Sequence, residues 1–476
     1  MPPGPTVLAR PILVAVLVCT VLVATVARRA HADERLSFHV PAKPLSADAV
    51  TSDWPAFLGP THDGHCPETH LLKTWPETGP TLIWELRTGD GYAAPSVVGH
   101  RLVLIHRVVN EQVVECRHAE TGDLLWEFRY PCNYRDRYGY GDGPRGAPAI
   151  ADGRVFTLGV EGKLHCLSLD DGELLWQRDL FSQYGMKQAF FGVGTSPLVV
   201  GPRVVVNIGA SLTGGPCVLA MDVKSGEDVW RAGAKWGPSY ATPVPATLHG
   251  RPRLLVFTGG ESRPPTGGLL CINPADGGID FRFPWRSRKF ESVNAANPVV
   301  IGDRVFVTAS YQTGGALICI KSDFSHDRVW TTHELGAHFN TPIHKAGYLY
   351  GFDGRHQRGA ELVCLSVETG KPVWRHAPEW TEIMPSSGKT VTMGTFRGCM
   401  IHADGDFLCL GEFGHLLWLD LTPAGYGQIV RHWLFATPET WTPPVVSRGL
   451  LYVMQNRRDS ATRRRPRLLC YDLRGP

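Results

Sequence analysis

Arginine and aromatic side chains are concentrated in a few turn-rich segments of this sequence. The two longest are CNYRDRYGYGDGPRG, residues 132–146, and FSQYGMKQAFFGVG, residues 181–194, and the shorter ones are KWGPSY, RKFESVNAAN and HELGAHFN. Cationic and aromatic side chains suit an anionic or sugar-like partner better than a calcium cage, which needs converging oxygen ligands. The candidate binding residues are Tyr134, Arg135, Asp136, Arg137, Arg145, Tyr240, Asn294, His338 and Asn340.

Motifs that would carry catalysis are absent from the sequence or incomplete. There is no H-E-x-x-H, no zinc-like spacing of His and Cys, and no G-x-S-x-G. Ser387–Thr390 ends like a phosphate loop, but Ile383 stands where the first glycine belongs. Asp136 lies between Arg135 and Arg137, an ion-pair cluster that would take it away from metal binding. The sequence therefore assigns no catalytic residue and no metal ligand.

The elements that position these loops are repeats. An apolar segment followed by Gly-x-x-x-Trp recurs, as in ECRHAETGDLLW, which ends at Trp126, and LAMDVKSGEDVW, which ends at Trp230. Phe281 takes the tryptophan position in a weaker copy, and the mean spacing is about 50 residues. The tryptophans assigned to packing between repeats are Trp84, Trp126, Trp176, Trp230, Trp330, Trp374 and Trp433.

Each repeat contains four short strands. The first begins just after a proline, as at Pro148 and Pro197, and the third runs into a Gly turn that leads to the tryptophan strand. Four strands per repeat of this length predict one blade of a β-propeller, and eight tryptophan positions predict eight blades. The loops that enter the first strands should then gather on one face, around the axis. The alternative is that these loops only cap the propeller, with their side chains hydrogen-bonded locally.

The two ends of the repeat array complement each other. The last repeat has three strands before the chain ends, and TLIWELR, residues 81–87, is a fourth strand with no repeat before it. We therefore expect an all-β, eight-bladed propeller in which this N-terminal strand completes the last blade and removes an exposed sheet edge. The expected organisation is a signal peptide or signal anchor at 1–32, an extended segment at 33–80 and the propeller at 81–476.

On these residues the chain resembles the pyrroloquinoline-quinone-like (PQQ-like) propeller repeats. Their A-x-D-x-x-T-G-x-x-x-W pattern matches Leu219–Trp230, and the sister repeats carry Cys in place of Ala. The lead-in DWPAFLGPTHDG, residues 53–64, looks like the exported members of that family in planctomycete-type bacteria. The resemblance implies a quinoprotein-like propeller in which the repeat tryptophans pack between neighbouring blades. Fold resemblance alone does not decide activity.

The repeat register also explains most of the cysteines. Cys116, Cys166, Cys271 and Cys364 each precede the turn glycine by six residues, a small buried position where Cys acts as an apolar residue. Cys319 and Cys470 are placed in the same position, and all six are expected to be free thiols. Disulfides stay open for the off-register set Cys66, Cys132, Cys217, Cys399 and Cys409.

The uncharged run from Pro11 to Ala27 predicts an export signal, either cleaved or retained as an anchor. The body should then be periplasmic, or anchored and facing the periplasm, with membrane contact only through an uncleaved N-terminus. Lys plus Arg is 48 against 45 for Asp plus Glu, a net charge of +3 that argues against nucleic acid as a partner.

Three functions remain open on this basis. We favour a non-catalytic envelope propeller that binds a protein, peptide or carbohydrate without a cofactor, similar in architecture to the propeller lipoprotein of the outer-membrane barrel-assembly machinery. The alternative is a PQQ-dependent quinoprotein dehydrogenase that oxidises an alcohol or sugar and needs the quinone with calcium. The chain has no adjacent Cys pair of the kind many such enzymes carry. A different enzyme or a sensor is the third possibility.

Overall fold

The computed structural model describes residues 1–2, 4, 33–186, 188–209, 215–233, 236–384 and 386–476. The predicted signal segment lies outside these residues, apart from three positions at its start. The chain divides into two units, residues 1–33 and residues 34–476, and all the strands belong to the second unit. Within the described residues, no helix is long and apolar enough to cross a membrane.

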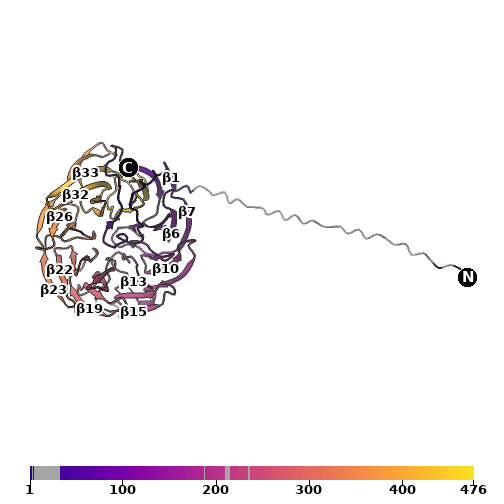
Figure 1. The fold of residues 1–476 in the computed structure, drawn as a ribbon, viewed down its shortest axis with the longest axis horizontal. Helices are drawn as coiled ribbons and strands as arrows, with labels where there is room; N and C mark the ends of the chain where they lie inside the picture. Colours follow the sequence, from indigo (N-terminus) through magenta and orange to yellow (C-terminus); the bar gives the residue numbers. More distant parts are fainter. Residues whose placement is uncertain (3, 5–32, 187, 210–214, 234–235, 385) are drawn as a thin grey trace. The chain divides into compact units, whose positions relative to one another are not determined.

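Residues 34–476 form eight blades arranged around a central axis, as predicted (Figure 1). Blade 1 consists of β4 (Ser96–Val98), β5 (Arg101–Val108), β6 (Glu111–His118) and β7 (Leu124–Pro131), and blade 2 of β8 (Ala149–Ala151), β9 (Arg154–Leu158), β10 (Lys163–Ser168) and β11 (Leu174–Asp179). Blade 3 consists of β12 (Leu198–Val200), β13 (Arg203–Asn207), β14 (Val218–Asp222) and β15 (Asp228–Ala232), and blade 4 of β16 (Val244–Leu248), β17 (Arg251–Thr258), β18 (Gly268–Ile272) and β19 (Ile279–Pro284). A short helix, α1 (Leu180–Tyr184), follows β11.

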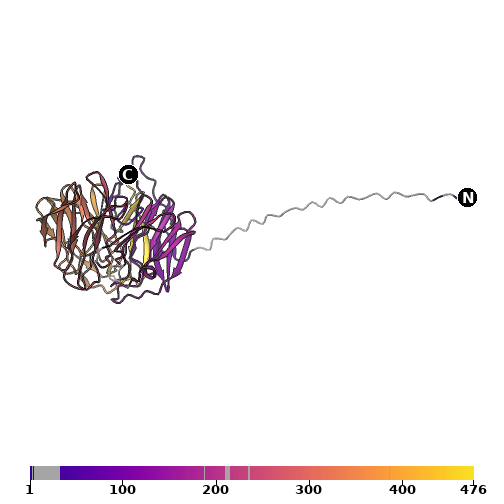
Figure 2. The same ribbon diagram turned by 90° about the horizontal axis from the view of Figure 1, so that it is seen from below.

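Blades 5 to 8 complete the ring. Blade 5 consists of β20 (Val299–Ile301), β21 (Arg304–Ala309), β22 (Gly314–Ile320) and β23 (His326–Thr332), and blade 6 of β24 (Ile343–Lys345), β25 (Tyr348–Asp353), β26 (Glu361–Ser366) and β27 (Pro372–His376). Blade 7 consists of β2 (His65–Cys66), β30 (Cys399–Ala403), β31 (Asp406–Leu410), β32 (His415–Thr422) and β33 (Gly425–Trp433). Blade 8 consists of β1 (Leu36–Phe38), β3 (Thr81–Arg87), β36 (Arg467–Asp472), β35 (Leu450–Gln455) and β34 (Val445–Ser447). A two-stranded hairpin, β28 (Glu379–Ile383) with β29 (Thr390–Gly394), lies between blades 6 and 7 in the sequence. Figure 2 shows the blades edge-on.

The predicted closure of the ring is confirmed. β3 pairs antiparallel with β36, with Leu82 opposite Tyr471 and Trp84 opposite Cys470. β1 then adds a fifth strand on the outside of β3. The outer edge of the last blade is therefore covered twice by the N-terminal part of the chain.

A regular contact joins each blade to the next. The indole N–H of Trp126 in β7 donates to the carbonyl of Leu169 in blade 2 at 2.9 Å, and five other tryptophans donate to the next blade in the same way. These five are Trp84, Trp176, Trp230, Trp330 and Trp374. Trp84, Trp126 and Trp230 are buried, and the others are half-buried. Burial of these rings and of their N–H groups stabilises the interfaces between blades.

Two register assignments were wrong. Trp433 pairs with His415 and donates to the carbonyl of Phe413, both in its own blade, and Val430 stands opposite Trp418 where the repeat tryptophan would be. Cys319 pairs with Asp327, two residues past the position opposite Trp330, and is only half-buried. The remaining described cysteines are buried, and every described cysteine is free, including the five for which a disulfide was open.

The segment between β1 and β3 crosses the central channel. Trp54 exchanges both backbone hydrogen bonds with Val97 of β4, and the carbonyl of Pro55 accepts from Ile150 of β8. Further along, β2 pairs in parallel with β30 of blade 7. The segment thus contacts the inner strands of blades 1, 2 and 7, and its buried Trp54 belongs to a core cluster that joins blades 7, 8 and 1.

Candidate functional site

A cavity of about 470 Å³ lies at the axis, where the loops that enter the inner strands meet. Phe57 and Leu58, from the segment that crosses the channel, line it from inside the ring. The sequence predicted a funnel at this place, but it did not predict that the N-terminal segment would contribute to its wall.

One position of the repeat recurs in the lining of this cavity. In seven blades the residue three places before the proline that precedes the inner strand lines the cavity. These residues are Tyr92, Arg145, Gly194, Tyr240, Ala295, Phe339 and Trp441. The repeat itself was therefore the signal that could have identified Tyr92, Phe339 and Trp441, which sequence reasoning missed.

Aromatic rings form a continuous belt around the cavity. Tyr311 contacts His338, and Phe339 lies 5.2 Å from Trp441 between ring centroids. Trp441 stacks on Tyr92 at 5.5 Å, and Tyr140 bridges from Trp441 to Phe191. We define the aromatic belt as Tyr92, Tyr138, Tyr140, Phe190, Phe191, Tyr311, Phe339 and Trp441, all of which line the cavity. Such rings provide apolar surface with little rotamer entropy to lose on binding.

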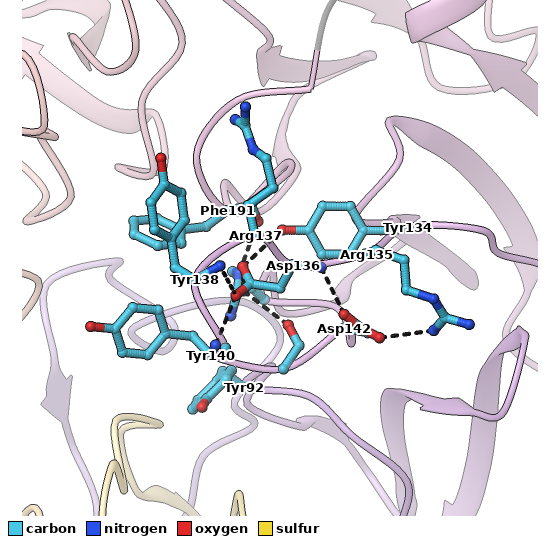
Figure 3. Close-up of polar contacts among 12 residues, drawn as sticks. Tyr92, Tyr134, Arg135, Asp136, Arg137, Tyr138, Tyr140, Asp142 and Phe191 are labelled. Carbon is cyan, nitrogen blue, oxygen red and sulfur yellow. Dashed lines mark hydrogen bonds and ion pairs between the residues drawn. The ribbon is translucent and has the colours of Figure 1, made fainter.

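Asp136 holds the longest of these loops in place (Figure 3). Its carboxylate accepts hydrogen bonds from the backbone N–H groups of Tyr138 and Tyr140, at 2.9 and 2.7 Å, and from the hydroxyl of Tyr134 at 3.1 Å. Arg145 Nη2 lies 3.3 Å from it, and the Asp136 side chain is 1% exposed. The Asp136 carboxylate therefore stabilises the loop that carries Tyr138 and Tyr140, which line the cavity, and it is not itself positioned to contact a ligand.

Arg145 is fixed between two rings of the belt. Its guanidinium carbon lies 5.3 Å from the centroid of Tyr92 and 5.7 Å from that of Phe191, and its Nε donates to the carbonyl of Phe191 at 2.9 Å. Tyr240 supports the same loop, because its hydroxyl accepts from the Phe191 N–H at 2.8 Å. Burial raises the pKa of Tyr240, so the phenol stays protonated.

A buried carboxylate organises the opposite wall. Glu412 is fully buried and pairs with Arg397, and it also accepts from Trp441 Nε1 at 2.9 Å. Arg397 Nη1 in turn lies 3.4 Å from His338 Nδ1. Burial, followed by the charge of Arg397, lowers the pKa of His338 to about 3, so this ring is neutral near pH 7. Glu412 and Arg397 were not among the predicted site residues.

The structure brings four of the nine predicted binding residues to the cavity, namely Arg145, Tyr240, His338 and Asn340. Tyr134 and the side chain of Asp136 are buried behind the wall, and Asn294 donates to the carbonyls of Thr258 and Trp285 from a buried position. Arg135 and Arg137 point to solvent from the loop, paired with Asp142 and Glu261 at 2.8 and 3.0 Å.

The described residues do not fit a calcium-held quinone. The carboxylates that line the cavity are Glu291 and Glu439, and Glu439 is paired with Arg457 at 2.6 Å. Asp136 already accepts four hydrogen bonds. Within the part of the chain that the structure describes, no group of three His, Cys, Asp or Glu side chains could hold a metal ion. Three arginines and a belt of rings instead favour recognition of a ligand without a metal.

Comparison with known proteins gives a family and a fold. A family model described as "Outer membrane protein assembly factor BamB" matches residues 110–376. No curated protein matches the sequence.

Many solved structures are similar to the chain, three of which are the following. BamB from Moraxella catarrhalis is 13% identical, with a TM-score of 0.54 over 83% of this chain and 98% of that one. A quinohemoprotein alcohol dehydrogenase from Comamonas testosteroni is 12% identical, with a TM-score of 0.60 over 90% and 82%. A europium-containing methanol dehydrogenase is 11% identical, with a TM-score of 0.63 over 88% and 98%. At these identities the likeness concerns the fold alone.

Proposed function

Because the chain belongs to the family described as outer membrane protein assembly factor BamB, we propose that it is a non-catalytic binding scaffold of the cell envelope. In this proposal the axial cavity holds a segment of a partner protein. The predicted export signal at the N-terminus is consistent with that location.

The observation that carries the proposal is the aromatic belt. Its rings come from loops of several different blades, and hydrogen bonds to Asp136 and to Glu412 hold the loops of Tyr140 and Trp441. The belt is therefore formed before any ligand arrives, so little ordering is needed on binding. Concave surfaces with rings and a few polar groups are where proteins commonly bind ligands, and aromatic residues dominate the energetics of protein interfaces.

A partner segment suits this cavity better than a compact substrate. The wall offers apolar rings to side chains, while Arg145 and Asn340 place polar groups beside them. A volume of about 470 Å³ has room for a few amino-acid side chains rather than a folded domain. A short, extended or looped stretch of a protein is the ligand that meets both conditions.

The test is a panel of fluorescent ten-residue peptides, rich either in leucine and phenylalanine or in serine and glycine, measured by fluorescence anisotropy. We expect the apolar peptides to bind and the polar ones not to bind. The double variant Tyr138→Ser with Phe191→Ser should weaken binding by about tenfold or more. Leu175→Ser, which removes an exposed leucine from β11 on the outer rim, is the matched control and should bind normally. If the double variant binds the apolar peptides as tightly as the native protein does, the proposal is refuted.

A further inference from the structure

The three arginines that line the cavity are not equivalent. Arg145 is paired with Asp136, and Arg397 with Glu412. Arg355 has no carboxylate within ion-pair distance among the described residues. Its guanidinium carbon lies 4.1 Å from the centroid of the Tyr311 ring. Arg355 therefore brings an uncompensated positive charge to the wall of an aromatic cavity, and the ring fixes its position.

Arg397 connects Arg355 to a second donor. The same nitrogen, Arg397 Nη1, donates to the backbone carbonyl of Arg355 at 2.7 Å and lies 3.4 Å from His338 Nδ1. Arginine cannot accept a hydrogen bond, so His338 Nδ1 must be the acceptor of this contact. A neutral imidazole that accepts at Nδ1 carries its proton on Nε2. The His338 ring, which lines the cavity, thus has an N–H to donate.

Both groups are held in place before any ligand arrives. Arg397 is fixed by the fully buried Glu412, which also accepts from Trp441 and from Gln357 Nε2 at 3.3 Å. Tyr311 contacts both donors, because its ring centroid lies 5.5 Å from that of His338 and 4.1 Å from the guanidinium carbon of Arg355. A fixed cation beside a neutral donor, with rings around them, is an arrangement that binds a planar anion.

From this arrangement we infer that Arg355 and His338 form a carboxylate subsite at one side of the cavity, which binds an acidic group of a peptide whose apolar side chains lie on the aromatic belt. The inference rests on the proposed function and specifies its ligand. A carboxylate matches the fork of the guanidinium, and the partly apolar surroundings strengthen a charge-assisted hydrogen bond. The acidic group has two possible sources, the C-terminus of the peptide or an Asp or Glu side chain.

One feature of the wall opposes an anion. Glu291 lines the same cavity, is exposed, and has no cationic partner within ion-pair distance among the described residues. Its negative charge should weaken the binding of a ligand carboxylate through the solvent. Replacing this one residue should therefore increase affinity, whereas replacing Arg355 should decrease it.

The experiment compares three versions of one N-acetylated tetrapeptide of leucine, alanine and a last phenylalanine, by isothermal titration calorimetry with the full folded chain. The first has a free C-terminal carboxylate, the second a C-terminal amide, and the third the amide plus one aspartate in place of alanine. We expect an acidic version to bind about tenfold or more tightly than the neutral amide. Preference for the first or the third version identifies the source of the carboxylate.

Variants connect this preference to the subsite. Arg355→Gln should abolish the difference between acidic and neutral peptides, and Glu291→Gln should increase the affinity for the acidic ones. Arg358→Gln removes an exposed arginine three residues away, outside the cavity lining, and should preserve the difference. Thermal melting checks that each variant is folded.

The two proposals fail in different ways. If neutral and acidic peptides bind the native protein equally well, or if Arg355→Gln keeps the preference, the carboxylate subsite is refuted and the peptide-binding function stands. If none of the three peptides binds, both proposals are contradicted.

Discussion

Gly172 in the turn of blade 2 lies directly on the indole ring of Trp126 in blade 1. A Cβ atom placed on Gly172 would be 2.6 Å from Trp126 Cε3, closer than packed atoms approach. The same indole donates its N–H to the carbonyl of Leu169 at 2.9 Å. The Gly-x-x-x-Trp repeat thus has two halves that meet across blades, since the glycine of one repeat packs on the tryptophan of the repeat before it. Gly122, Gly226, Gly277 and Gly370 repeat the contact, on Trp84, Trp176, Trp230 and Trp330.

The first prediction separates this contact from backbone strain. Gly172 and Gly153 both belong to blade 2 and both have positive φ, 76° and 69°, but nothing lies within 4 Å of a Cβ on Gly153. Gly153→Ala should therefore cost only the strain of the left-handed conformation, about 1–2 kcal/mol. Gly172→Ala should lower the free energy of unfolding by about 1–3 kcal/mol more, because the ring must move as well. Denaturant unfolding measures both, and equal losses would mean that the contact contributes nothing.

The second prediction concerns ring closure. A chain that starts at residue 88 lacks β3 and leaves β36 with an unpaired edge, so it should aggregate or fail to fold. A chain that starts at residue 34 should be monomeric and folded. Residues 34–87 supplied as a separate chain should restore solubility, and the same segment with Trp84→Asp should not. Size-exclusion chromatography and circular dichroism measure the outcome, and a stable monomer from residue 88 onward would contradict the closure.

The third prediction concerns acid. His165 is buried against the rings of Tyr130 and Phe128, at 4.2 and 5.2 Å, and burial lowers its pKa to about 4. An unfolded histidine has a pKa near 6.5, so between about pH 6.5 and 4 the unfolded chain binds a proton that the folded chain does not. Stability must therefore fall as the pH falls through this window, by about 3 kcal/mol from this group at pH 4. His165→Phe should show a smaller loss of Tm between pH 7 and 4, and an unchanged loss would count against the buried neutral ring.

The fourth prediction is that the protein has no quinone-dependent dehydrogenase activity of its own. Such chemistry needs oxygen ligands that hold calcium at the quinone and a free carboxylate to take the proton. Of the carboxylates near the cavity, Glu412 is paired with Arg397 and Glu439 with Arg457, which leaves Glu291 as a single carboxylate without the converging oxygen ligands that calcium needs. Purified protein incubated with quinone and calcium should not reduce a dye when an alcohol or an aldose is added. Dye reduction that depends on all three additions would contradict this prediction.

The sequence predicted the architecture well because the repeat encodes a contact that recurs at six of the blade interfaces. The position opposite Cys116 must be filled by a ring that reaches the next blade, so Trp126 and its equivalents can be found by spacing alone. The prediction went wrong where a blade departs from the repeat. In blade 7, the tryptophan lies on the third strand, as Trp418, and Val430 stands opposite it on the fourth strand. Trp433 lies further along that fourth strand, opposite His415.

The site was less predictable, because a loop's composition does not say which of its side chains turn inward. Tyr134, Asp136 and Arg145 all belong to the loop at residues 132–146. Hydrogen bonds between Asp136 and its own loop turn Tyr134 and Asp136 away from the cavity, whereas Arg145 lines it. Arg355 follows β25, in a turn that had no aromatic or proline signal. Its place beside Tyr311 depends on contacts between blades that no local pattern contains.

Whether the cavity holds a segment of a partner protein can be measured by site-specific photo-cross-linking in intact cells. A photoreactive phenylalanine analogue replaces Tyr138 at the rim of the cavity or Leu175 on the outer strand β11, both of which are exposed. The cross-linked segment is then identified by mass spectrometry. We expect one dominant envelope protein captured through Tyr138, not captured through Leu175, and lost when Phe191 and Trp441 are replaced by serine. Equal capture at both positions, or capture that survives the loss of the two rings, would contradict the proposed binding of a partner segment.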